Sequence, residues 1–284
     1  MPAITYVNGR YMPLRAASVN VEDRGYQFGD GIYEVLFVHR GRLVDAGLHL
    51  ARLERSLEEI ELHAPMSAAA LHAVIGEVLR RNRIETGVVY LQITRGVARR
   101  DHPIPSPAPR PSLVITARRK PAPPARIEDW TAEAITQPDT RWGRCDIKST
   151  NLLPNVLART AAQRAGAYEA ILYDSAGNVT EGAASTVWIV SAQGALVTRN
   201  LDRHILPGCT RAALLEALAA EGLRAEEREI SLAELRAARE IFLTSATSFV
   251  KPVIRLDSAA IGNGAPGATA SALFELYMHR LGAG

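Results

Sequence analysis

The sequence contains a lysine whose neighbours suit it to chemistry at an amine. Lys148 lies in CDIKSTNLLPN, between an expected strand and an expected helix, with the apolar Ile147 beside it. Partial burial lowers the pKa of a lysine toward the range in which its amine acts as a nucleophile or a base. Most lysines are solvated surface charges, and its position alone would leave Lys148 among them.

A carboxylate and a helix start could complete a site for an anionic ligand. Glu181 follows the turn sequence DSAGN, so it could keep a ring nitrogen protonated or be an ordinary turn carboxylate in water. Cys209 and Thr210 follow Gly208 where a helix is expected to begin, and free backbone N–H groups there can bind a phosphate. Arg52, on an earlier helix, could be a second phosphate contact or part of a polar helix face.

A third group of residues could bind a carboxylate. Arg100 and His102 alternate in the loop sequence ARRDHPIP, and alternate residues of an extended segment point the same way. Together with the hydroxyl of Tyr33 they could trap a carboxylate. Arg95 and Arg99 lie close by in the sequence, and spacing does not choose among the three arginines.

The elements that must position these residues occur in blocks rather than in strict alternation. The predicted strands lie at 33–39, 88–96, 113–119, 131–136, 170–174, 185–190 and 241–246. The predicted helices lie at 48–64, from Ser67 onward, and at 153–166, 209–222 and 271–281. Blocks of this kind favour an α+β fold over a doubly wound parallel sheet.

A change in composition marks the expected boundary between two domains. The 284 residues are enough for two domains. The sequence RRKPAPPAR predicts a linker over 119–128, which leaves a small N-terminal α/β domain over 1–118 and a larger domain over 129–284. A second proline-rich stretch, HPIPSPAPRP, predicts a long loop between two strands, and such loops often carry function.

Composition argues against several classes of protein. The chain is 47% hydrophobic and 22% charged, and its 33 Lys and Arg nearly balance its 30 Asp and Glu. It lacks a basic run interleaved with aromatics, so we expect no nucleic-acid partner. We also find no export signal and no apolar run long enough for a membrane span. Cys145 and Cys209 predict neither a disulfide framework nor a metal site, and we expect a cytoplasmic protein.

Taken together and in this order, these segments resemble the class IV aminotransferases, which are the fold-type IV pyridoxal phosphate enzymes. The resemblance runs from about residue 24 to residue 254, nearly the whole chain. It rests on RGYQFGDGIYEV, HLARLERS, DIKSTNLLPNVLA, NVTEGAAST, ILPGCTR and LTSATSFVKPV. It implies an α+β fold in which the larger domain over 129–284 binds the cofactor and contains a pseudo-barrel.

The resemblance also implies a role for each candidate residue. Lys148 would be the catalytic Schiff-base lysine for pyridoxal 5′-phosphate, and Glu181 would face the pyridine nitrogen. The other cofactor contacts would be Arg52, Leu206, Cys209, Thr210, Ala246 and Thr247. Ala246 stands where the family often has a hydroxyl residue, so a phosphate-binding hydroxyl would be missing here while the main-chain donor remains, and Thr247 could compensate.

Within this family, a tyrosine at the start of the GxYE strand and an Arg-x-His pair are typical of enzymes that act on D-amino acids. The match implies that Tyr33, Arg100 and His102 bind the substrate carboxylate, with the latter two reaching across a homodimer. The implied reaction is transamination between D-amino acids, such as D-alanine or D-glutamate, and 2-oxo acids, such as 2-oxoglutarate or pyruvate. Three alternatives stay open: an (R)-selective amine transaminase, a lyase on the same scaffold, and a non-catalytic cofactor-binding protein.

Overall fold

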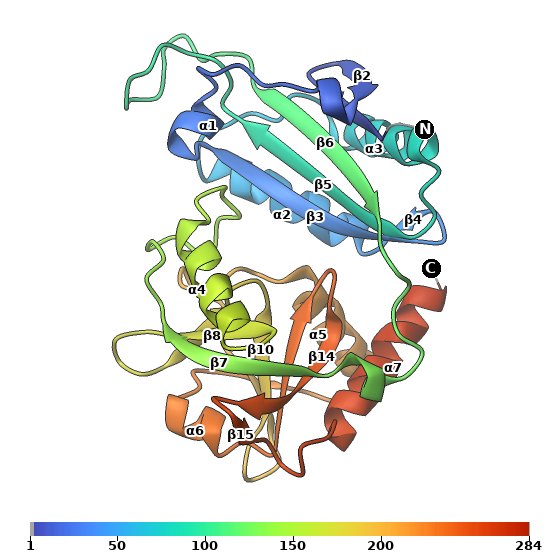
Figure 1. Cartoon of the computed structure of the whole chain (residues 1–284), viewed down its shortest axis with the longest axis vertical. Helices are drawn as coiled ribbons and strands as arrows, with labels where there is room; N and C mark the ends of the chain where they lie inside the picture. Colours follow the sequence, from blue (N-terminus) through green and yellow to red (C-terminus); the bar gives the residue numbers. More distant parts are fainter. Residues whose placement is uncertain (1–2, 284) are drawn as a thin grey trace. The chain divides into compact units, whose positions relative to one another are not determined.

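The computed structural model describes residues 3–283, whose helices and strands form two compact units (Figure 1). Unit 1 comprises the residues up to Ala122 together with Ile147–Asn151. Unit 2 comprises Pro123–Asp146 together with the residues from Leu152 onward. Sheets and helices occur in both units without regular alternation, so the expected α+β class is confirmed. The short segment around Lys148, which we expected within 129–284, is instead part of unit 1.

Unit 1 is built on an antiparallel sheet with the strand order β2-β1-β6-β5-β3-β4. Its strands are β1 (Ile4–Val7), β2 (Arg10–Pro13), β3 (Gly31–His39), β4 (Arg42–Leu43), β5 (Gly87–Thr94) and β6 (Ser112–Arg119). The apolar patterns predicted β3, β5 and β6 but missed the β1–β2 hairpin. Its Asn8-Gly9 turn, with positive φ at both residues, was the signal that could have found it.

Two helices, α2 (Ala46–Glu58) and α3 (Ala68–Asn82), pack on this sheet around one apolar core (Figure 1). As expected, α3 begins after Ser67, whose hydroxyl accepts a hydrogen bond from Ala70 N. The expectation that the earlier helix runs to residue 64 is wrong, because the chain turns at Glu61, which has a φ of +52°. Buried side chains from both helices and from β3, β5 and β6 form the core.

Unit 2 contains a sheet with the order β12-β11-β10-β13-β14-β7-β8-β9, in which β15 also pairs with β14. Its strands are β7 (Ala132–Pro138), β8 (Glu169–Tyr173), β9 (Val179–Gly182), β10 (Thr186–Val190), β11 (Leu196–Thr198), β12 (Glu226–Glu227), β13 (Glu240–Ser245), β14 (Phe249–Leu256) and β15 (Ala259–Ala260). β9 leads almost directly into β10, yet β13, β14, β7 and β8 lie between them in the sheet order. The sheet must curl to allow this, so the expected pseudo-barrel is confirmed as a curled half-barrel.

The helices of unit 2 cover this curled sheet. They are α4 (Leu153–Arg164), α5 (Cys209–Ala220), α6 (Leu232–Arg236) and α7 (Ala268–Ala283). Pro154 lies in the first turn of α4, where a missing N–H costs no hydrogen bond. Inside the unit, Trp188 of β10 stacks on Phe242 of β13 with ring centroids 5.7 Å apart. Helix α5 contacts β13 and α7 contacts β14, so both helices pack on the central strands.

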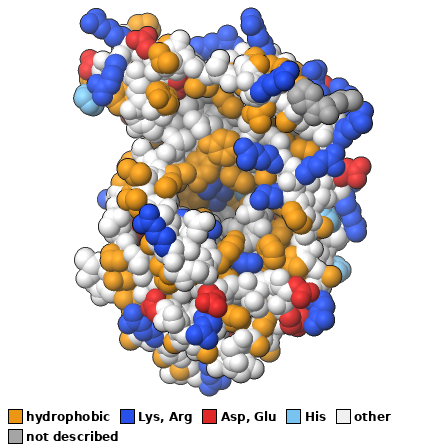
Figure 2. Space-filling view, in the orientation of Figure 1, with side chains coloured by type: hydrophobic (Ala, Val, Ile, Leu, Met, Phe, Trp, Pro, Cys, Tyr) orange, Lys and Arg blue, Asp and Glu red, His pale blue; other side chains and the backbone are white. Residues whose placement is uncertain are grey.

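Charged side chains are spread over the face shown in Figure 2 rather than gathered in one place on it. On the face shown in Figure 2, Lys and Arg side chains of the described residues lie singly or in small groups among hydrophobic and uncharged ones. Within residues 3–283, no helix is both long enough and apolar enough to cross a membrane.

The proline-rich loop between β5 and β6 closes tightly at its base. Gly96 has a φ of +91°, and a Cβ atom there would lie 2.0 Å from the carbonyl oxygen of Arg110. The two ends of the loop can therefore meet only if residue 96 has no side chain. This constraint fixes where the loop that carries Arg100 and His102 leaves the sheet.

We predict that Gly96→Ala lowers the free energy of unfolding by about 3 kcal/mol, because it adds a backbone clash to an unfavourable φ. Gly9→Ala is the matched control: Gly9 has a φ of +94°, but a Cβ atom there would have no neighbour within 4 Å. It should cost only about 1 kcal/mol. Denaturation midpoints of the two variants measure the difference, and equal midpoints would contradict the constraint at the loop base.

Candidate active site

Lys148 is held against β3 by main-chain hydrogen bonds. Its carbonyl accepts from Tyr33 N at 3.1 Å, and Thr150 N donates to Gly31 O at 3.0 Å. The Lys148 N–H in turn donates to Ser56 Oγ of α2 at 3.3 Å. A short segment that carries no helix or strand is therefore fixed between a core strand and a core helix. Its backbone position is set independently of where the lysine side chain points.

The Lys148 amine lies next to one of the expected carboxylate-binding groups. Its Nζ is 3.5 Å from Tyr33 Oη and 4.4 Å from the centre of the tyrosine ring. Among the described residues, no carboxylate forms an ion pair with this amine. The ring of Tyr33 stacks on Tyr90, whose hydroxyl donates to Gln92 Oε1 at 2.6 Å. The structure thus brings Lys148 and Tyr33 together. The amine forms no direct ion pair, although Glu34 lies near enough for its charge to interact with that of Lys148.

The chain has only three lysines, which narrows the choice of a reactive amine. Lys120 is exposed at the end of unit 1. Lys251 is buried in β14, with its Nζ 3.5 Å from the centre of the Trp130 ring and 4.6 Å from that of Tyr168. Burial lowers the pKa of Lys251 to about 8. The lowered pKa would favour Lys251 as the reactive amine, but aromatic rings surround that amine. Lys148 instead lies next to the hydroxyl of Tyr33, which could bind a substrate.

Arg52, the expected phosphate contact, is part of a buried ion pair. Its Nε and Nη2 donate to the two oxygens of Glu34 at 2.7 and 2.8 Å, and His49 Nδ1 lies 2.7 Å from Glu34 Oε2. Burial alone would raise the pKa of Glu34, but the charge and hydrogen bonds of Arg52, aided by His49, lower it to about 2. Glu34 therefore stays ionised and fixes the plane of the guanidinium. Sequence reasoning missed both Glu34 and His49.

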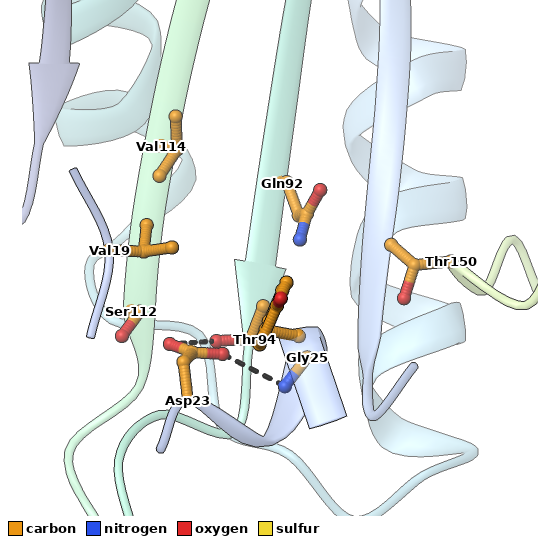
Figure 3. A pocket seen from close by; sticks show the side chains of 9 residues that line it. Val19, Asp23, Gly25, Gln92, Thr94, Ser112, Val114 and Thr150 are labelled. Carbon is orange, nitrogen blue, oxygen red and sulfur yellow. Dashed lines mark hydrogen bonds between the residues drawn. The ribbon is translucent and has the colours of Figure 1, made fainter. Parts of the chain in front are cut away.

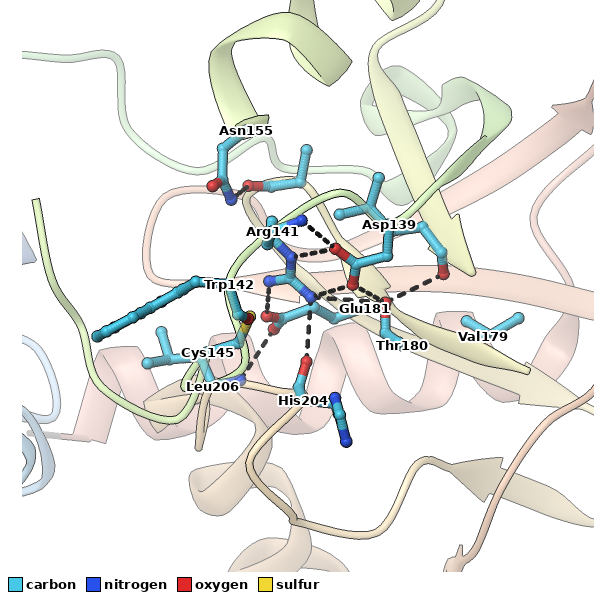
Figure 4. A network of polar contacts seen from close by, with 12 residues as sticks. Asp139, Arg141, Trp142, Cys145, Asn155, Val179, Thr180, Glu181, His204 and Leu206 are labelled. Atoms are coloured by element: carbon cyan, nitrogen blue, oxygen red, sulfur yellow. Dashed lines mark hydrogen bonds and ion pairs between the residues drawn. The ribbon is translucent and has the colours of Figure 1, made fainter. Parts of the chain in front are cut away.

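Glu181, the expected partner of a ring nitrogen, is buried and held from two sides (Figure 4). Arg141 Nη1 donates to its Oε1, and Leu206 N donates to its Oε2 at 3.2 Å. Leu206, also an expected cofactor contact, is thus tied to Glu181 through its backbone. A guanidinium next to a carboxylate favours the charged form of that carboxylate. Glu181 is therefore set up as a fixed negative charge rather than as a solvated turn residue.

Arg141, which the sequence did not identify, is the centre of this network. Besides Glu181 it binds Asp139, whose Oδ2 lies 2.7 Å from Nη2, and it donates to the carbonyl of His204 at 3.0 Å (Figure 4). Burial opposes the charged form, but Glu181 and Asp139 outweigh it and raise the pKa of Arg141 above its usual value. Burial, together with these carboxylates, raises the pKa of the nearby Cys145 thiol to about 12. That cysteine is therefore a buried thiol rather than a thiolate.

The start of α5 is suited to an anion, because the first N–H groups of a helix have no partner within the helix itself. Helix α5 begins at Cys209 with Gly208 as its N-cap, and no side chain caps it. A Cβ atom at Gly208 would lie 2.7 Å from Thr186 Oγ1, so any larger residue there would force the Thr186 side chain to shift. Thr186 of β10 pairs in register with Thr244 of β13, the strand that leads into the turn with Ala246 and Thr247. The expected phosphate residues Cys209, Thr210, Ala246 and Thr247 all belong to unit 2 and to these two segments.

The structure distinguishes among the three arginines of the expected trap. Arg95 is buried and uses Nε, Nη1 and Nη2 on Asp30 and on the carbonyls of Ile60 and Glu61, so each of its nitrogens is already engaged. Arg99 and Arg100 are exposed. Arg100 lies over the ring of Phe28, with Cζ 5.2 Å from its centroid, and the ring of His102 lies 5.6 Å from the same centroid.

A cavity of about 310 Å³ opens on unit 1 near Tyr33 (Figure 3). Gln92, which lines it, is the cross-strand neighbour of Tyr33, and Thr150 in its wall lies two residues after Lys148. The other lining residues are Val19, Asp23, Gly25, Tyr26, Thr94, Ser112 and Val114. Both oxygens of Asp23 are already used, by Gly25 N and by the Thr94 hydroxyl. The cavity therefore combines apolar walls with polar groups and has space for a small molecule.

Two curated relatives resemble this chain over most of their length, and both are named D-alanine aminotransferase. The relative from Bacillus licheniformis is 42% identical over 261 residues, which are 92% of this chain and 90% of the relative. The relative from Listeria innocua serovar 6a is 38% identical over 276 residues, which are 97% of this chain and 95% of the relative.

Solved structures show the same fold. The branched-chain amino acid aminotransferase of Escherichia coli matches with a TM-score of 0.89 and 21% identity, covering 98% of this chain and 94% of that one. A hypothetical aminotransferase from Mycobacterium tuberculosis, solved in a PLP-bound form, matches with a TM-score of 0.83 and 24% identity, covering 99% of each chain. The fold-type IV architecture expected from the sequence is thereby confirmed.

The family model described as "Amino-transferase class IV" matches residues 31–256. This range extends from the start of β3 to the end of β14 and includes Lys148, Glu181 and the start of α5. With the relatives at 38% and 42% identity, it identifies the chain as a member of the class IV aminotransferase family.

Proposed function

We propose that this protein transfers amino groups between D-amino acids and 2-oxo acids with pyridoxal 5′-phosphate as its cofactor. The observation that carries the proposal is the Lys148 amine, which lies 3.5 Å from the Tyr33 hydroxyl and pairs with no acid among the described residues. Membership in the class IV aminotransferases and two relatives named D-alanine aminotransferase support the reaction and the D-configuration. D-Alanine or D-glutamate with 2-oxoglutarate or pyruvate are the substrates to test.

The residues of this chain fit the cofactor. Lys148 would hold it covalently, Glu181 would pair with its ring nitrogen, and Leu206 would pack against its ring. The phosphate would be held by Arg52 and by the segments that carry Cys209, Thr210, Ala246 and Thr247. The uncapped start of α5, the glycine cradle at Gly208 and the buried, fixed carboxylate of Glu181 each match one part of this group. When bound, pyridoxal phosphate supplies the carbon that receives the amino group and a ring that delocalises the electrons released at the substrate α-carbon.

The side chains of the protein would orient the substrate and move its proton. Tyr33, Arg100 and His102 bind the carboxylate, which fixes the α-carbon relative to the Lys148 amine. Lys148 Nζ then takes the α-proton as a general base and returns a proton as a general acid. Arg141 keeps Glu181 ionised, so that Glu181 can hold a proton on the ring nitrogen. The donor amino acid leaves as a 2-oxo acid. A second 2-oxo acid then receives the amino group with the help of the same residues, which act in reverse order.

We further propose that the active protein is a cytoplasmic homodimer. Arg100 and His102 are exposed on the single chain, which suits residues that serve the active site of a second copy. Size-exclusion chromatography with light scattering measures this assembly directly. A purely monomeric and fully active protein would contradict it.

Replacing Lys148 by Ala should abolish transamination of D-alanine, because the variant loses both the base and the covalent anchor of the cofactor. The measurements are the steady-state rate and the visible absorbance of the protein titrated with pyridoxal phosphate. Lys251→Met, which removes the buried amine of β14 and keeps an apolar chain beside Trp130, is the matched control and should retain both signals. Steady turnover by Lys148→Ala would refute the assignment.

Replacing Arg100 by Ala should lower kcat/KM for D-alanine by about a hundredfold, because a charge-assisted bond to the carboxylate is lost. Arg99→Ala is the control, since Arg99 is an equally exposed neighbour without an assigned role. An (R)-amine without a carboxylate and a reaction without 2-oxo acid complete the assay. Activity on the amine that exceeds activity on D-alanine would favour an amine transaminase, and pyruvate release from D-alanine without an acceptor would favour a lyase.

Glu34→Gln should reduce the stability of the protein by about 3 kcal/mol at pH 7, because it leaves the buried Arg52 charge uncompensated. The pKa of Glu34 is lowered in the folded state to about 2, so its contribution is full above about pH 4.5 and is lost as the pH falls toward 2. The difference from wild type, measured by denaturation, should therefore shrink on acidification.

The matched control for this prediction is Glu77→Gln. The pKa of Glu77 is also lowered to about 2, by hydrogen bonds from Arg80 and Arg81, but this carboxylate is on the surface, where water screens its charge. Its replacement should change stability little at any pH. Equal effects of the two substitutions would show that burial of the Glu34–Arg52 pair does not matter.

A further inference from the structure

We propose that Arg24 is a positioning residue that sets the conformation of the Arg100-Asp101-His102 segment and thereby the affinity for the substrate carboxylate. The inference rests on the proposed function, in which Arg100 and His102 bind that carboxylate. Arg24 does not itself contact the substrate in this proposal. It acts through the main chain of the segment.

Arg24 donates to two consecutive carbonyls of this segment. Its Nη1 is 2.6 Å from Asp101 O, and its Nη2 is 3.1 Å from His102 O. Its Nε donates to Asp30 Oδ2 at 2.8 Å, and its side chain is only 4% exposed. All three nitrogens are therefore used, and the planar guanidinium fixes both carbonyls at once.

The ring of Phe28, one turn further along the same short helix α1 (Arg24–Phe28), gives the segment a second contact. Arg24 Cζ lies 4.7 Å from its centroid, Arg100 Cζ lies 5.2 Å from it, and the ring of His102 lies 5.6 Å from it. The side chains of Arg100 and His102 therefore lie against the ring of Phe28. Arg24, which lies next to this ring, binds the backbone carbonyls of Asp101 and His102.

Before residue 99 the loop is held by main-chain hydrogen bonds. Arg24 N donates to Gly96 O at 2.9 Å and Ala98 N donates to Glu22 O at 3.3 Å, so a short backbone ladder ends there. Beyond it, within residues 3–283, Arg24 is the one side chain outside the loop with a hydrogen bond to the main chain at 100–102. Without this guanidinium the exposed segment would lose both of these hydrogen bonds and keep only its contacts with the ring of Phe28.

Arg95 provides a close comparison within the same unit. It too is 4% exposed, and its Nε also donates to Asp30 Oδ2 at 2.8 Å. Its Nη1 and Nη2 donate to the carbonyls of Glu61 and Ile60, which follow α2 rather than belong to the trap. Arg24 and Arg95 thus share burial, charge partner and a pair of carbonyl acceptors, and differ in which segment they hold.

The test compares Arg24→Met with Arg95→Met in the holoenzyme. Each variant loses one buried charge and two carbonyl hydrogen bonds, so both should melt at lower temperature than wild type. Only Arg24→Met should raise KM for D-alanine, by about tenfold or more, with kcat changed less than about threefold. Only Arg24→Met should raise, by a similar factor, the inhibition constant of propionate, which offers a carboxylate without an amine.

Equal changes in KM and in propionate inhibition for the two variants, or no change in Arg24→Met, would overturn the inference. Arg24→Lys decides the question if Arg24→Met does not fold, because lysine keeps a charge beside Asp30 but lacks the planar fork that spans two carbonyls. It too should raise KM and the propionate constant, and wild-type values would overturn the inference. Arg100→Ala, assayed in parallel, separates the two levels: if it binds propionate as wild type does, the carboxylate trap itself is wrong.

Discussion

Burial of arginine with a carboxylate partner is the interaction on which the candidate site depends. Removing a charged group from water costs several kcal/mol unless it is paired and hydrogen-bonded, so each buried guanidinium is compatible with few arrangements of its surroundings. Arg52 is fixed by Glu34, Arg141 by Glu181 and Asp139, and Arg24 by Asp30. The first pair orients a group that would bind the cofactor phosphate, and the second orients the carboxylate that would face the ring nitrogen. The third orients the guanidinium that binds the loop with Arg100 and His102.

The same pairs explain how segments that are not paired in a sheet are held in fixed positions relative to each other. Arg141 ties Glu181 to the carbonyl of His204, and Glu181 in turn accepts from Leu206 N. A strand end and a loop are thus joined through side chains rather than through sheet hydrogen bonds. Lys148 is held differently, by main-chain hydrogen bonds to β3, and among the described residues its amine forms no direct ion pair.

The sequence predicted the elements with a clear period and the residues within ordered motifs. Strands β3, β5, β10 and β13 and the cap of α3 at Ser67 followed from apolar spacing and capping chemistry. Lys148 and Glu181 could be singled out only because several motifs occur in a fixed order. Taken alone, each was more consistent with a solvated side chain. The partners of those residues could not be derived from spacing: Arg141 and Glu181 are 40 positions apart, and Arg24 reaches Asp101 across 77. Yet Arg24, Asp30 and Glu34 all lie in RGYQFGDGIYEV, and the charged Glu34 within the apolar run of β3 was the available signal.

Beside the loop that carries Arg100 and His102, buried positive charges outnumber the negative charge that they contact. Arg24 and Arg95 both contact the same oxygen of Asp30, so one negative charge faces two positive ones, and four backbone carbonyls supply the rest of the compensation. Carbonyl dipoles orient a guanidinium but do not cancel its net charge. Asp30 thus matches only one of these two positive charges, and a positive charge attracts any small carboxylate, whichever side chain it bears. Attraction of this kind does not discriminate between enantiomers. Under the proposed function, discrimination would come from the fixed positions of Tyr33, Arg100 and His102, and hence from the backbone that Arg24 holds.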